Sequence, residues 1–463
     1  MTAPADSSGT WRELFGRRHG GTAVVLAGGV AIYATNEFIT MSLLPSMVAD
    51  IGGVRLYAWV TSVYLVASVA GAAGVGSVLS RFGPRASYLA ALLTFAAGTA
   101  VCAAAPSMAV LLSGRAIQGA AGGVLAGLGY AVISATLPSR LWTRASATVS
   151  AMWGVGTLLG PAAGGIFAQF GWWRAGFVSL LALAVLMAAV VPAALPVRAG
   201  RPPERIAVPV GSLLLLSASA LAVSVAALPR SGWATPALLA FALALMVLFV
   251  WVDRHAAAKV LPRNVFGPGP LKWIYAVLGL LMAATMVDMY VPLFAQRLAG
   301  LTPVVAGFLG AALSVGWTVA EIRSASLAGP RATARVVAVA PLVMACGLAL
   351  AALTQPEAPA PVAVAAWAAA LVLAGAGIGM AWPHLSVWAM AGADGAAQQA
   401  VAGAAITTVQ LICGAFGAGL AGVLTNVRPT PDAAVARTAF AVFAALAVAA
   451  LIGTVRVARR PRG

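Results

Sequence analysis

Three charged side chains lie inside long apolar stretches of this sequence: Glu37, Asp288 and Arg115. A charge at the centre of a bilayer costs about 2.5–3.5 kcal/mol or more, so such residues predict a function, such as carrying a proton or pairing with a charged ligand. The alternative is structural: an acid neutralises Arg115 and holds two helices together. Arg115, near the end of its stretch, could also extend its charge to the interface.

Two other ionisable residues are expected to be less important. Glu321 is expected at a cytoplasmic helix end, and His384, which follows Pro383, is expected to be solvated at another helix end. Neither residue forms part of a catalytic triad, and the chain shows no phosphate-binding loop or metal-ligand spacing. We therefore expect no enzyme, no ATP-driven pump, no metal and no cofactor.

Polar and aromatic residues accompany the buried charges and could line a substrate cavity. Aromatic rings beside a buried acid suit amphipathic or cationic ligands, through apolar burial and cation–π contacts. The alternative is an aromatic belt at the membrane interface, which we expect for Trp142, Trp172, Trp173 and Trp233. The cavity candidates are Tyr33, Asn36, Thr40, Tyr64, Gln118, Tyr130, Trp153, Tyr290, Trp382 and Gln410.

The composition shows which elements must position these residues. Of 463 residues, 62% are hydrophobic and only 8% are charged, and the mean hydropathy is +0.97. A soluble protein is about 25% charged, so this chain is predicted to be an all-α polytopic membrane protein. The net charge of +17 comes from arginines between apolar runs and predicts no nucleic-acid binding. The three cysteines lie in apolar runs, which argues against a disulfide framework.

Fourteen apolar runs are long enough to predict membrane-spanning helices. They are residues 21–44, 56–79, 86–105, 109–136, 145–169, 174–195, 207–228, 233–252, 271–298, 303–321, 335–354, 361–382, 398–424 and 433–456, with loops at 356–361 and 383–397. If the N-terminus is cytoplasmic, the inside segments hold 21 Lys and Arg residues and the outside loops hold six. Positive residues accumulate on the cytoplasmic side, so both termini are predicted to be cytoplasmic.

A weak internal repeat divides the runs into two halves. Glu37 precedes Pro45 in the first run, and Asp288 precedes Pro292 at similar depth in the ninth. Inverted or parallel repeats are common in transporters, and this one predicts two six-helix bundles with two inserted helices. The predicted parts are a cytoplasmic segment (1–20), an N-terminal bundle (21–197), a linker with the inserted pair (198–270), a C-terminal bundle (271–456) and a basic cytoplasmic tail (457–463).

The fifth run carries glycines four residues apart: Gly156, Gly160 and Gly164, with Pro161 and Gly165. This spacing predicts a close helix contact, and proline bends a helix. A packing face of this kind occurs in many membrane proteins. The full string is more specific: it resembles the antiporter motif of the drug:proton antiporters in the major facilitator superfamily.

Other motifs carry the same resemblance. The segment between runs two and three is similar to the superfamily's cytoplasmic loop signature at Gly76, Arg81, Gly83 and Arg85, although Ser80 stands where the family has an aspartate that helps close the cytoplasmic side. Arg115, Gln118 and Gly119 resemble the family motif tied to proton coupling. Segments 233–266 and 290–296 resemble the fourteen-spanner branch, whereas Asn36–Pro45 resembles twelve-spanner exporters.

The resemblance implies a proton-coupled exporter of amphipathic small molecules, of the multidrug efflux type, that works by alternating access. The implied partners are small amphipathic or cationic substrates, protons and membrane lipids. The implied location is the plasma (inner) membrane of a bacterium, and the protein is expected to be a monomer. Two alternatives stay open: a dedicated exporter of an endogenous metabolite or lipid, and a membrane sensor or assembly factor that transports nothing.

Overall fold

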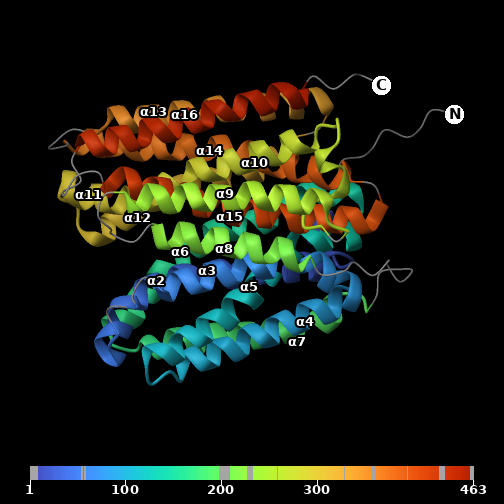
Figure 1. Ribbon diagram of the computed structural model, residues 1–463, viewed down its shortest axis with the longest axis horizontal. Helices are drawn as coiled ribbons and strands as arrows, with labels where there is room; N and C mark the ends of the chain where they lie inside the picture. The colour runs from blue at the N-terminus through green and yellow to red at the C-terminus, as the bar shows by residue number, and fades with distance from the viewer. Residues whose placement is uncertain are drawn as a thin grey trace. The chain divides into compact units, whose positions relative to one another are not determined.

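The computed structural model is helical throughout the residues that it describes, which are 9–53, 56, 59–197, 209–226, 233–257, 259–327, 329–355, 360–393, 395–426 and 433–458 (Figure 1). Residues 198–206 of the predicted linker and 459–463 of the predicted basic tail lie outside these residues. So do Arg230 and Glu357, which the charge bias predicts to lie in loops on the outer side of the membrane. The first helices are α1 (Trp11–Leu14), α2 (Gly20–Ile51), α3 (Trp59–Ala73), α4 (Val75–Ala103), α5 (Met108–Thr136), η2 (Ser139–Leu141), α6 (Trp142–Gln169) and α7 (Trp173–Ala194). The later helices are α8 (Val210–Ala226), α9 (Ala234–His255), η3 (Arg263–Phe266), α10 (Leu271–Thr285), η4 (Met286–Tyr290), α11 (Val291–Ala299), α12 (Pro303–Ser324), α13 (Pro330–Leu353), α14 (Pro361–Ala391), α15 (Gly395–Asn426) and α16 (Ala433–Ala458).

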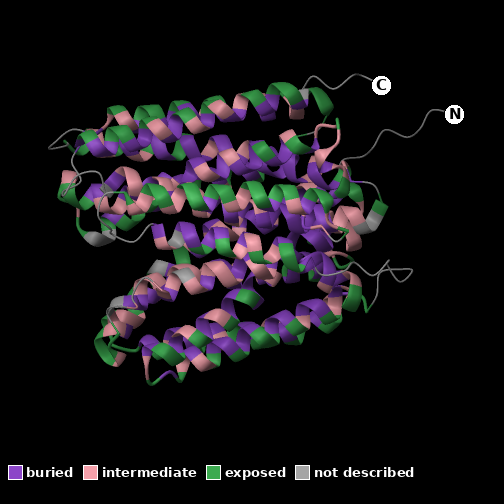
Figure 2. Ribbon diagram, in the orientation of Figure 1, coloured by how far each residue is buried: buried purple, intermediate pink, exposed green. Residues whose placement is uncertain are grey.

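The prediction of an all-helical multi-pass fold is confirmed, but fourteen full-length spans are not. Among the described residues, twelve helical segments are long and apolar enough to cross a membrane. Two apolar helices are shorter, namely 59–73 and 210–223, where the sequence predicted runs 56–79 and 207–228. Large apolar side chains such as Leu186, Leu214 and Leu353 are exposed, as expected of helices whose solvent is lipid. Exposed residues recur along many of the helices (Figure 2).

Three predicted helix boundaries are wrong. The run 271–298 is not one helix, because the 3₁₀ turn η4 separates α10 from α11. The break expected at 383–397 is much shorter, since α14 continues through Pro383 to Ala391 and α15 begins at Gly395. The break predicted between the second and third runs, residues 80–85, lies inside α4. This helix begins at Val75, and within it Gly83 alone has non-helical backbone angles.

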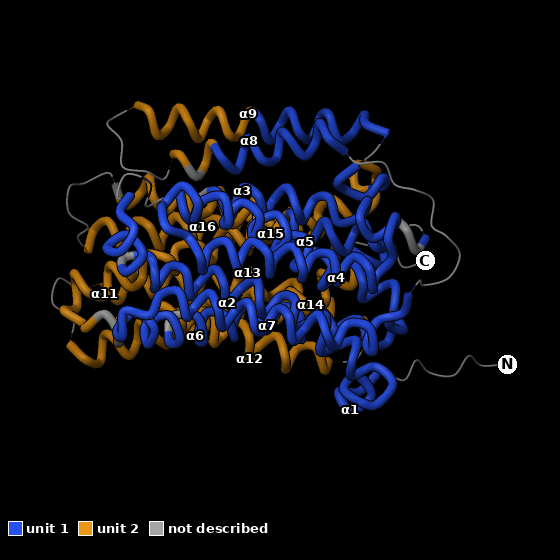
Figure 3. Tube along the Cα trace, turned by 90° about the horizontal axis from the view of Figure 1, so that it is seen from below, with its two compact units in different colours: residues 1–221, 245–264, 389–408 blue, residues 222–244, 265–388, 409–463 orange. Residues whose placement is uncertain are grey.

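The chain divides into two compact units (Figure 3). Unit 1 comprises residues 1–221, 245–264 and 389–408, and unit 2 comprises 222–244, 265–388 and 409–463. Within unit 1, α2 packs on α6, α3 and α4 pack on α5, and α4 packs on α7. Within unit 2, α13 and α10 pack on α16, and α11 packs on α12. The unit boundaries fall within α8, α9, η3, α14 and α15, and the sequence-based division into bundles stays a prediction.

The two units contain the same kind of helix crossing. In each, one helix carries two glycines four residues apart, and a Cβ at either glycine would overlap a backbone oxygen of the neighbouring helix. Only glycine permits so close an approach of two backbones. The crossing pairs are Gly119 with Tyr64 and Gly123 with Ser68 between α5 and α3, and Gly375 with Leu313 and Gly379 with Trp317 between α14 and α12.

A second feature also recurs in the two units. The tripeptide Gly-Pro-Arg occurs at Gly83–Arg85, where the main part of α4 starts, and at Gly329–Arg331, where α13 starts. Gly83 has φ 75° and Gly329 has φ 95°, a backbone region that favours glycine. Proline then suits the first helical position, because it has no N–H to leave unpaired. Both features support the internal repeat that Glu37 and Asp288 suggested.

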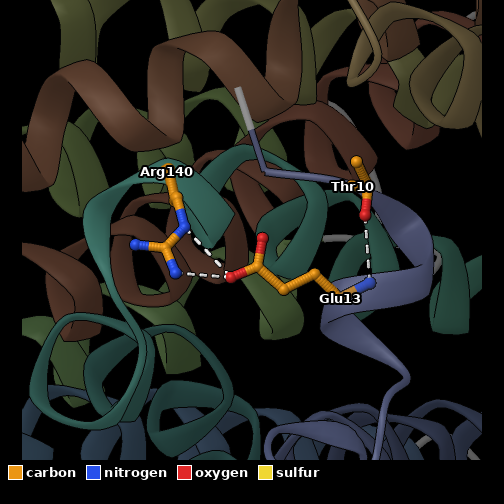
Figure 4. Close-up of polar contacts among 3 residues, drawn as sticks. All are labelled: Thr10, Glu13 and Arg140. Atoms are coloured by element: carbon orange, nitrogen blue, oxygen red, sulfur yellow. Dashed lines mark hydrogen bonds and ion pairs between the residues drawn. The ribbon is translucent and has the colours of Figure 1, made fainter. Parts of the chain in front are cut away.

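The N-terminal segment is held against the α5–α6 connection (Figure 4). Thr10 caps α1 by accepting the Glu13 N–H at 3.1 Å. Arg140 donates from Nε and Nη2 to Glu13 Oε1, at 3.0 and 2.6 Å. Residues 10–14 are therefore joined to η2 across more than one hundred residues of sequence.

Candidate functional site

Three glycines of the fifth run form the α2–α6 contact. A Cβ at Gly156 would lie 2.6 Å from Ala34 Cβ and one at Gly164 would lie 2.7 Å from Ser42 Cβ, while one at Gly160 would overlap Phe38 Cβ. We call Gly156, Gly160 and Gly164 the glycine face of α6. Their spacing of four places them on one side of the helix.

The remaining residues of the resembling motif behave differently. Gly165 has no atom within 4 Å of its Cβ position, so it takes no part in the α2–α6 contact. The side chain of Pro161 lies outside the described residues. The close packing that the glycine spacing predicted therefore involves Gly156, Gly160 and Gly164 but not Gly165.

Glu37 lies on α2 directly beside the residues that meet the glycine face. Its side chain is half-buried, and its Oε2 atom is buried with no hydrogen-bond partner. Desolvation disfavours the charged form of a carboxylate. Loss of a proton from Glu37 therefore places a negative charge beside a buried oxygen that has no hydrogen-bond donor.

Arg115 of α5 is fully enclosed and does not extend to an interface, since only 1% of it is exposed. Its Nε donates to the Val60 carbonyl oxygen at 3.1 Å, and its Nη1 donates to Gln118 Oε1 at 2.9 Å and to Asn36 Oδ1 at 3.3 Å. The guanidinium also lies 4.0 Å from the centroid of the Tyr64 ring. Among the described acids none lies within ion-pair distance of Arg115, so neutral acceptors and an aromatic ring hold this charge.

The hydrogen-bond network around Arg115 joins four helices, α2, α3, α4 and α5. Gln118 Nε2 donates to Thr99 Oγ1 of α4 at 2.8 Å and to Asn36 Oδ1 of α2 at 3.3 Å. The Asn36 Nδ2 atom is buried without a hydrogen-bond partner. A buried unpaired donor is costly, and here it lies one residue from Glu37.

Three of the predicted cavity aromatics form one cluster in unit 1. Tyr33 stacks on Tyr64 with ring centroids 5.5 Å apart, and it meets Trp153 of α6 edge to face at 5.3 Å. The Tyr33 hydroxyl is buried without a hydrogen-bond partner. Thr40 is buried, and its hydroxyl donates to the Asn36 carbonyl oxygen at 2.6 Å.

Tyr130 lies apart along α5. It is 1% exposed, and its backbone approaches Gly403 of α15, whose Cβ position lies 2.9 Å from the Tyr130 carbonyl carbon. Nearby, Thr407 donates to the Ala126 carbonyl oxygen at 3.3 Å. The beginning of α15 therefore packs on the end of α5 within unit 1.

Asp288 and Tyr290 lie in the 3₁₀ turn η4, and both are half-buried. Pro292 has no N–H, so it cannot donate to the Asp288 carbonyl oxygen as an α-helix requires. The Val291 N–H donates to that oxygen instead, which gives the tighter 3₁₀ geometry. Interrupted helices of this kind often mark functional positions in membrane proteins.

The other predicted residues of unit 2 are buried. Trp382 of α14 is 0% exposed, and its ring lies 5.4 Å from that of Trp317. Gln410 of α15 is 2% exposed, and its Oε1 atom has no hydrogen-bond partner.

The expectation for His384 is wrong, and Glu321 is more enclosed than its position near a helix end suggests. Glu321 does lie near the end of α12, but it is 0% exposed and accepts from Trp317 Nε1 at 3.0 Å. His384 is 4% exposed, and its Nε2 lies 2.8 Å from Ser324 Oγ. The sequence signal for Glu321 was its spacing of four from Trp317, which places both on one helix face. His384 carried no comparable signal, because its partner comes from another helix.

The cytoplasmic loop signature has both long-range and local contacts. Arg85 Nε donates to the Leu195 carbonyl oxygen at the end of α7, at 2.8 Å, and Arg81 lies over the ring of its neighbour Phe82. Ser80 donates to the Ser77 carbonyl oxygen of its own helix. The Cβ position of Gly76 lies 3.2 Å from Val401 of α15. A serine hydroxyl bonded to its own helix carries no charge, so it cannot replace the charge of the family aspartate.

The aromatic belt stays a prediction for Trp172 and Trp233 and is wrong for Trp142 and Trp173. Trp172 and Trp233 are exposed, whereas Trp142 and Trp173 are 7% and 2% exposed. Each buried indole has a hydrogen-bond acceptor: Trp142 Nε1 donates to the Leu137 carbonyl oxygen, and Trp173 Nε1 donates to Asp50 Oδ2.

Comparisons with known proteins agree with this architecture. The sequence matches the Major Facilitator Superfamily over residues 26–418. It is 56% identical over 468 residues to a probable multidrug-efflux transporter of Mycobacterium tuberculosis strain H37Rv, which covers 100% of this chain and 99% of that protein.

Solved structures share the fold at low sequence identity. The human organic anion transporter MFSD10 superposes with a TM-score of 0.69 at 15% identity, covering 94% of this chain and 99% of that chain. The proton:xylose symporter XylE superposes with a TM-score of 0.68 at 14% identity, covering 94% of each chain. These likenesses concern the fold alone.

Proposed function

Because the chain belongs to the Major Facilitator Superfamily, a family of membrane transporters, we propose that it exports amphipathic small molecules, cations included, in exchange for protons. The name of its 56% identical relative, a probable multidrug-efflux transporter, supports this substrate class. The observation that carries the proposal is the glycine face of α6 packed against the helix turn that holds Glu37. The proposed location is the plasma membrane of a bacterium.

The proposed topology has fourteen crossings with both termini in the cytoplasm. The two inserted crossings would be α8 and α9. Asp253 at the end of α9 supports their pairing: it is 0% exposed and accepts from Ser212 Oγ at 2.9 Å and from the Val260 N–H at 2.8 Å. A buried acid with this many donors is structural, because its charge is already satisfied.

Glu37 is the proposed proton carrier. Its carboxylate lacks a hydrogen-bond partner at Oε2, and the positive charge of Arg115 is held nearby by the Asn36–Gln118 network. Protonation of Glu37 would remove the negative charge that faces a substrate, and release would restore it. Coupling then follows from competition between a proton and a cation for one carboxylate.

Asp288 is the proposed second acid and favours cationic ligands. It lies where the 3₁₀ turn η4 interrupts the helix, and interrupted helices are found at transporter ion and substrate sites. The positive charge of Arg115 would act on the Glu37 carboxylate through space. Tyr33, Asn36, Thr40, Tyr64, Gln118, Tyr130, Trp153, Tyr290, Trp382 and Gln410 remain the proposed cavity residues.

Transport in proteoliposomes tests the proposal. The purified protein is reconstituted, a pH gradient is imposed, and uptake of a fluorescent amphipathic cation into inside-out oriented vesicles is followed. Gradient-dependent accumulation that a protonophore abolishes is expected. If no amphipathic compound moves but a cell-derived metabolite extract or lipid does, the protein is a dedicated exporter. If nothing moves, the transport proposal is wrong.

A further inference from the structure

An open apolar groove of about 440 Å³ runs between α12, α13 and α14 in unit 2. Its walls include Val315 and Val319 of α12, Val336 of α13 and Val372 of α14. Val315, Val319 and Val372 are 40%, 43% and 39% exposed, so the groove opens to the surroundings of the protein. In a membrane those surroundings are acyl chains.

One end of this groove is strongly positive. Arg323, in the last turn of α12, lines the groove and is exposed. Arg331 and Arg335 lie four residues apart in the first turns of α13, next to Val336, and both are exposed. Residues 322–355 contain no acidic residue, and Glu321 is buried and accepts from Trp317.

The start of α13 adds to this positive field. Helix N-termini carry a partial positive charge and unpaired N–H groups, which favour anions. Arginine also binds phosphate in a bidentate manner. An amphipathic cation would be repelled here, whereas an amphipathic anion has both an apolar groove for its tail and donors for its head.

We propose that this groove binds one anionic diacyl phospholipid. One acyl chain lies between Val319 and Val372, and the phosphate lies against Arg323 and the first turn of α13. Basic pockets between membrane helices are typical sites for anionic headgroups. On the proposed topology, the lipid belongs to the cytoplasmic leaflet.

Thermal stability of the delipidated full-length protein in detergent tests this site. Phosphatidylglycerol should raise the melting temperature more than phosphatidylcholine with the same acyl chains, because a ligand that binds the folded state stabilises it. Arg323→Gln should lose most of this difference. Arg297→Gln is the matched control, since it removes one exposed arginine from α11, a helix that contributes no residue to the groove lining. It should keep the full difference.

A second variant tests the acyl-chain part of the site. Ala376 is half-buried and lines the groove, so Ala376→Phe should fill it and also remove the phosphatidylglycerol effect. Equal stabilisation of the native sequence by the two lipids would overturn the proposal. So would an equal effect of glycerol phosphate alone, which would indicate an anion site without a lipid tail. Should Ala376→Phe fail to fold, loss or retention of the effect in Arg323→Gln decides.

Discussion

Gly160 of α6 lies directly against Phe38 of α2, so closely that a Cβ at position 160 would overlap the Phe38 Cβ and approach the Ile39 nitrogen to 3.0 Å. The proposed proton carrier, Glu37, precedes Phe38. Any displacement of α2 away from α6 at this level therefore moves Glu37 relative to Arg115.

Substitution of Gly160 should impair transport more than substitution of Gly165. Overpacking costs about 1–3 kcal/mol, and here it separates two helices at the level of Glu37, so Gly160→Ala and Gly164→Leu should lose export while still inserting. Gly165→Ala is the matched control, because its Cβ would meet no atom within 4 Å. Export per inserted molecule is the measurement. If Gly164→Leu exports at the wild-type rate, the glycine face has no role in transport.

Cysteine labelling tests the proposed topology. On a background without native cysteines, membrane-impermeant reagent added outside should label cysteines placed at Arg230 and Glu357, and none placed at 196–206. These positions lie largely outside the described residues, so the expectation rests on the charge bias between the two sides. External labelling of the 196–206 segment contradicts fourteen crossings.

The contact between Glu13 and Arg140 should depend on pH. Two hydrogen bonds from Arg140 hold the pKa of the Glu13 carboxyl below its usual range. A lowered pKa in the docked state means that the contact is stabilised above the ordinary glutamate pKa of about 4.3 and is lost as pH falls through the lowered value. Hydrogen exchange of residues 10–15 should be slow at neutral pH and faster in Glu13→Gln. Arg17→Gln, which alters only the charge of an exposed neighbour, should leave it slow. Equal exchange in all three proteins means that the contact does not hold the segment.

Asp288→Asn should weaken binding of cationic compounds more than of neutral ones. A hydrogen bond to a charged group contributes about 1.5–3 kcal/mol, so cation affinity should fall about tenfold or more. Binding of a matched cationic and neutral pair, measured by fluorescence quenching, gives the ratio. An equal loss for both compounds would show that Asp288 shapes the site without selecting charge.

Hydropathy was sufficient to predict most of the helices, and a spacing of four was sufficient to predict the face formed by Gly156, Gly160 and Gly164. Local geometry was harder to foresee. A run of apolar residues carries no sign of the 3₁₀ turn at 286–290, although Pro292, which removes the hydrogen bond to Asp288, was visible.

Tertiary partners account for the other errors. Trp142 and Trp173 are buried because the Leu137 carbonyl and the Asp50 carboxylate accept their indole N–H groups, and a position near a predicted helix end does not reveal such acceptors. The Arg115 network was only partly visible in the sequence: Gln118 lies three residues away on the same helix, but Asn36 and the Val60 carbonyl oxygen come from other helices.

The most direct measurement of the central claim compares two transport modes in Glu37→Gln. Glutamine resembles the protonated carboxyl but cannot release a proton, so the variant should bind neutral substrate and perform substrate exchange without a gradient. It should fail to accumulate substrate against its gradient when a pH difference is imposed. Both modes are measured in the same proteoliposomes with a radiolabelled neutral substrate. Exchange without accumulation is the predicted result. If Glu37→Gln still builds a substrate gradient driven by pH, Glu37 is not the proton carrier, and Asp288 becomes the candidate.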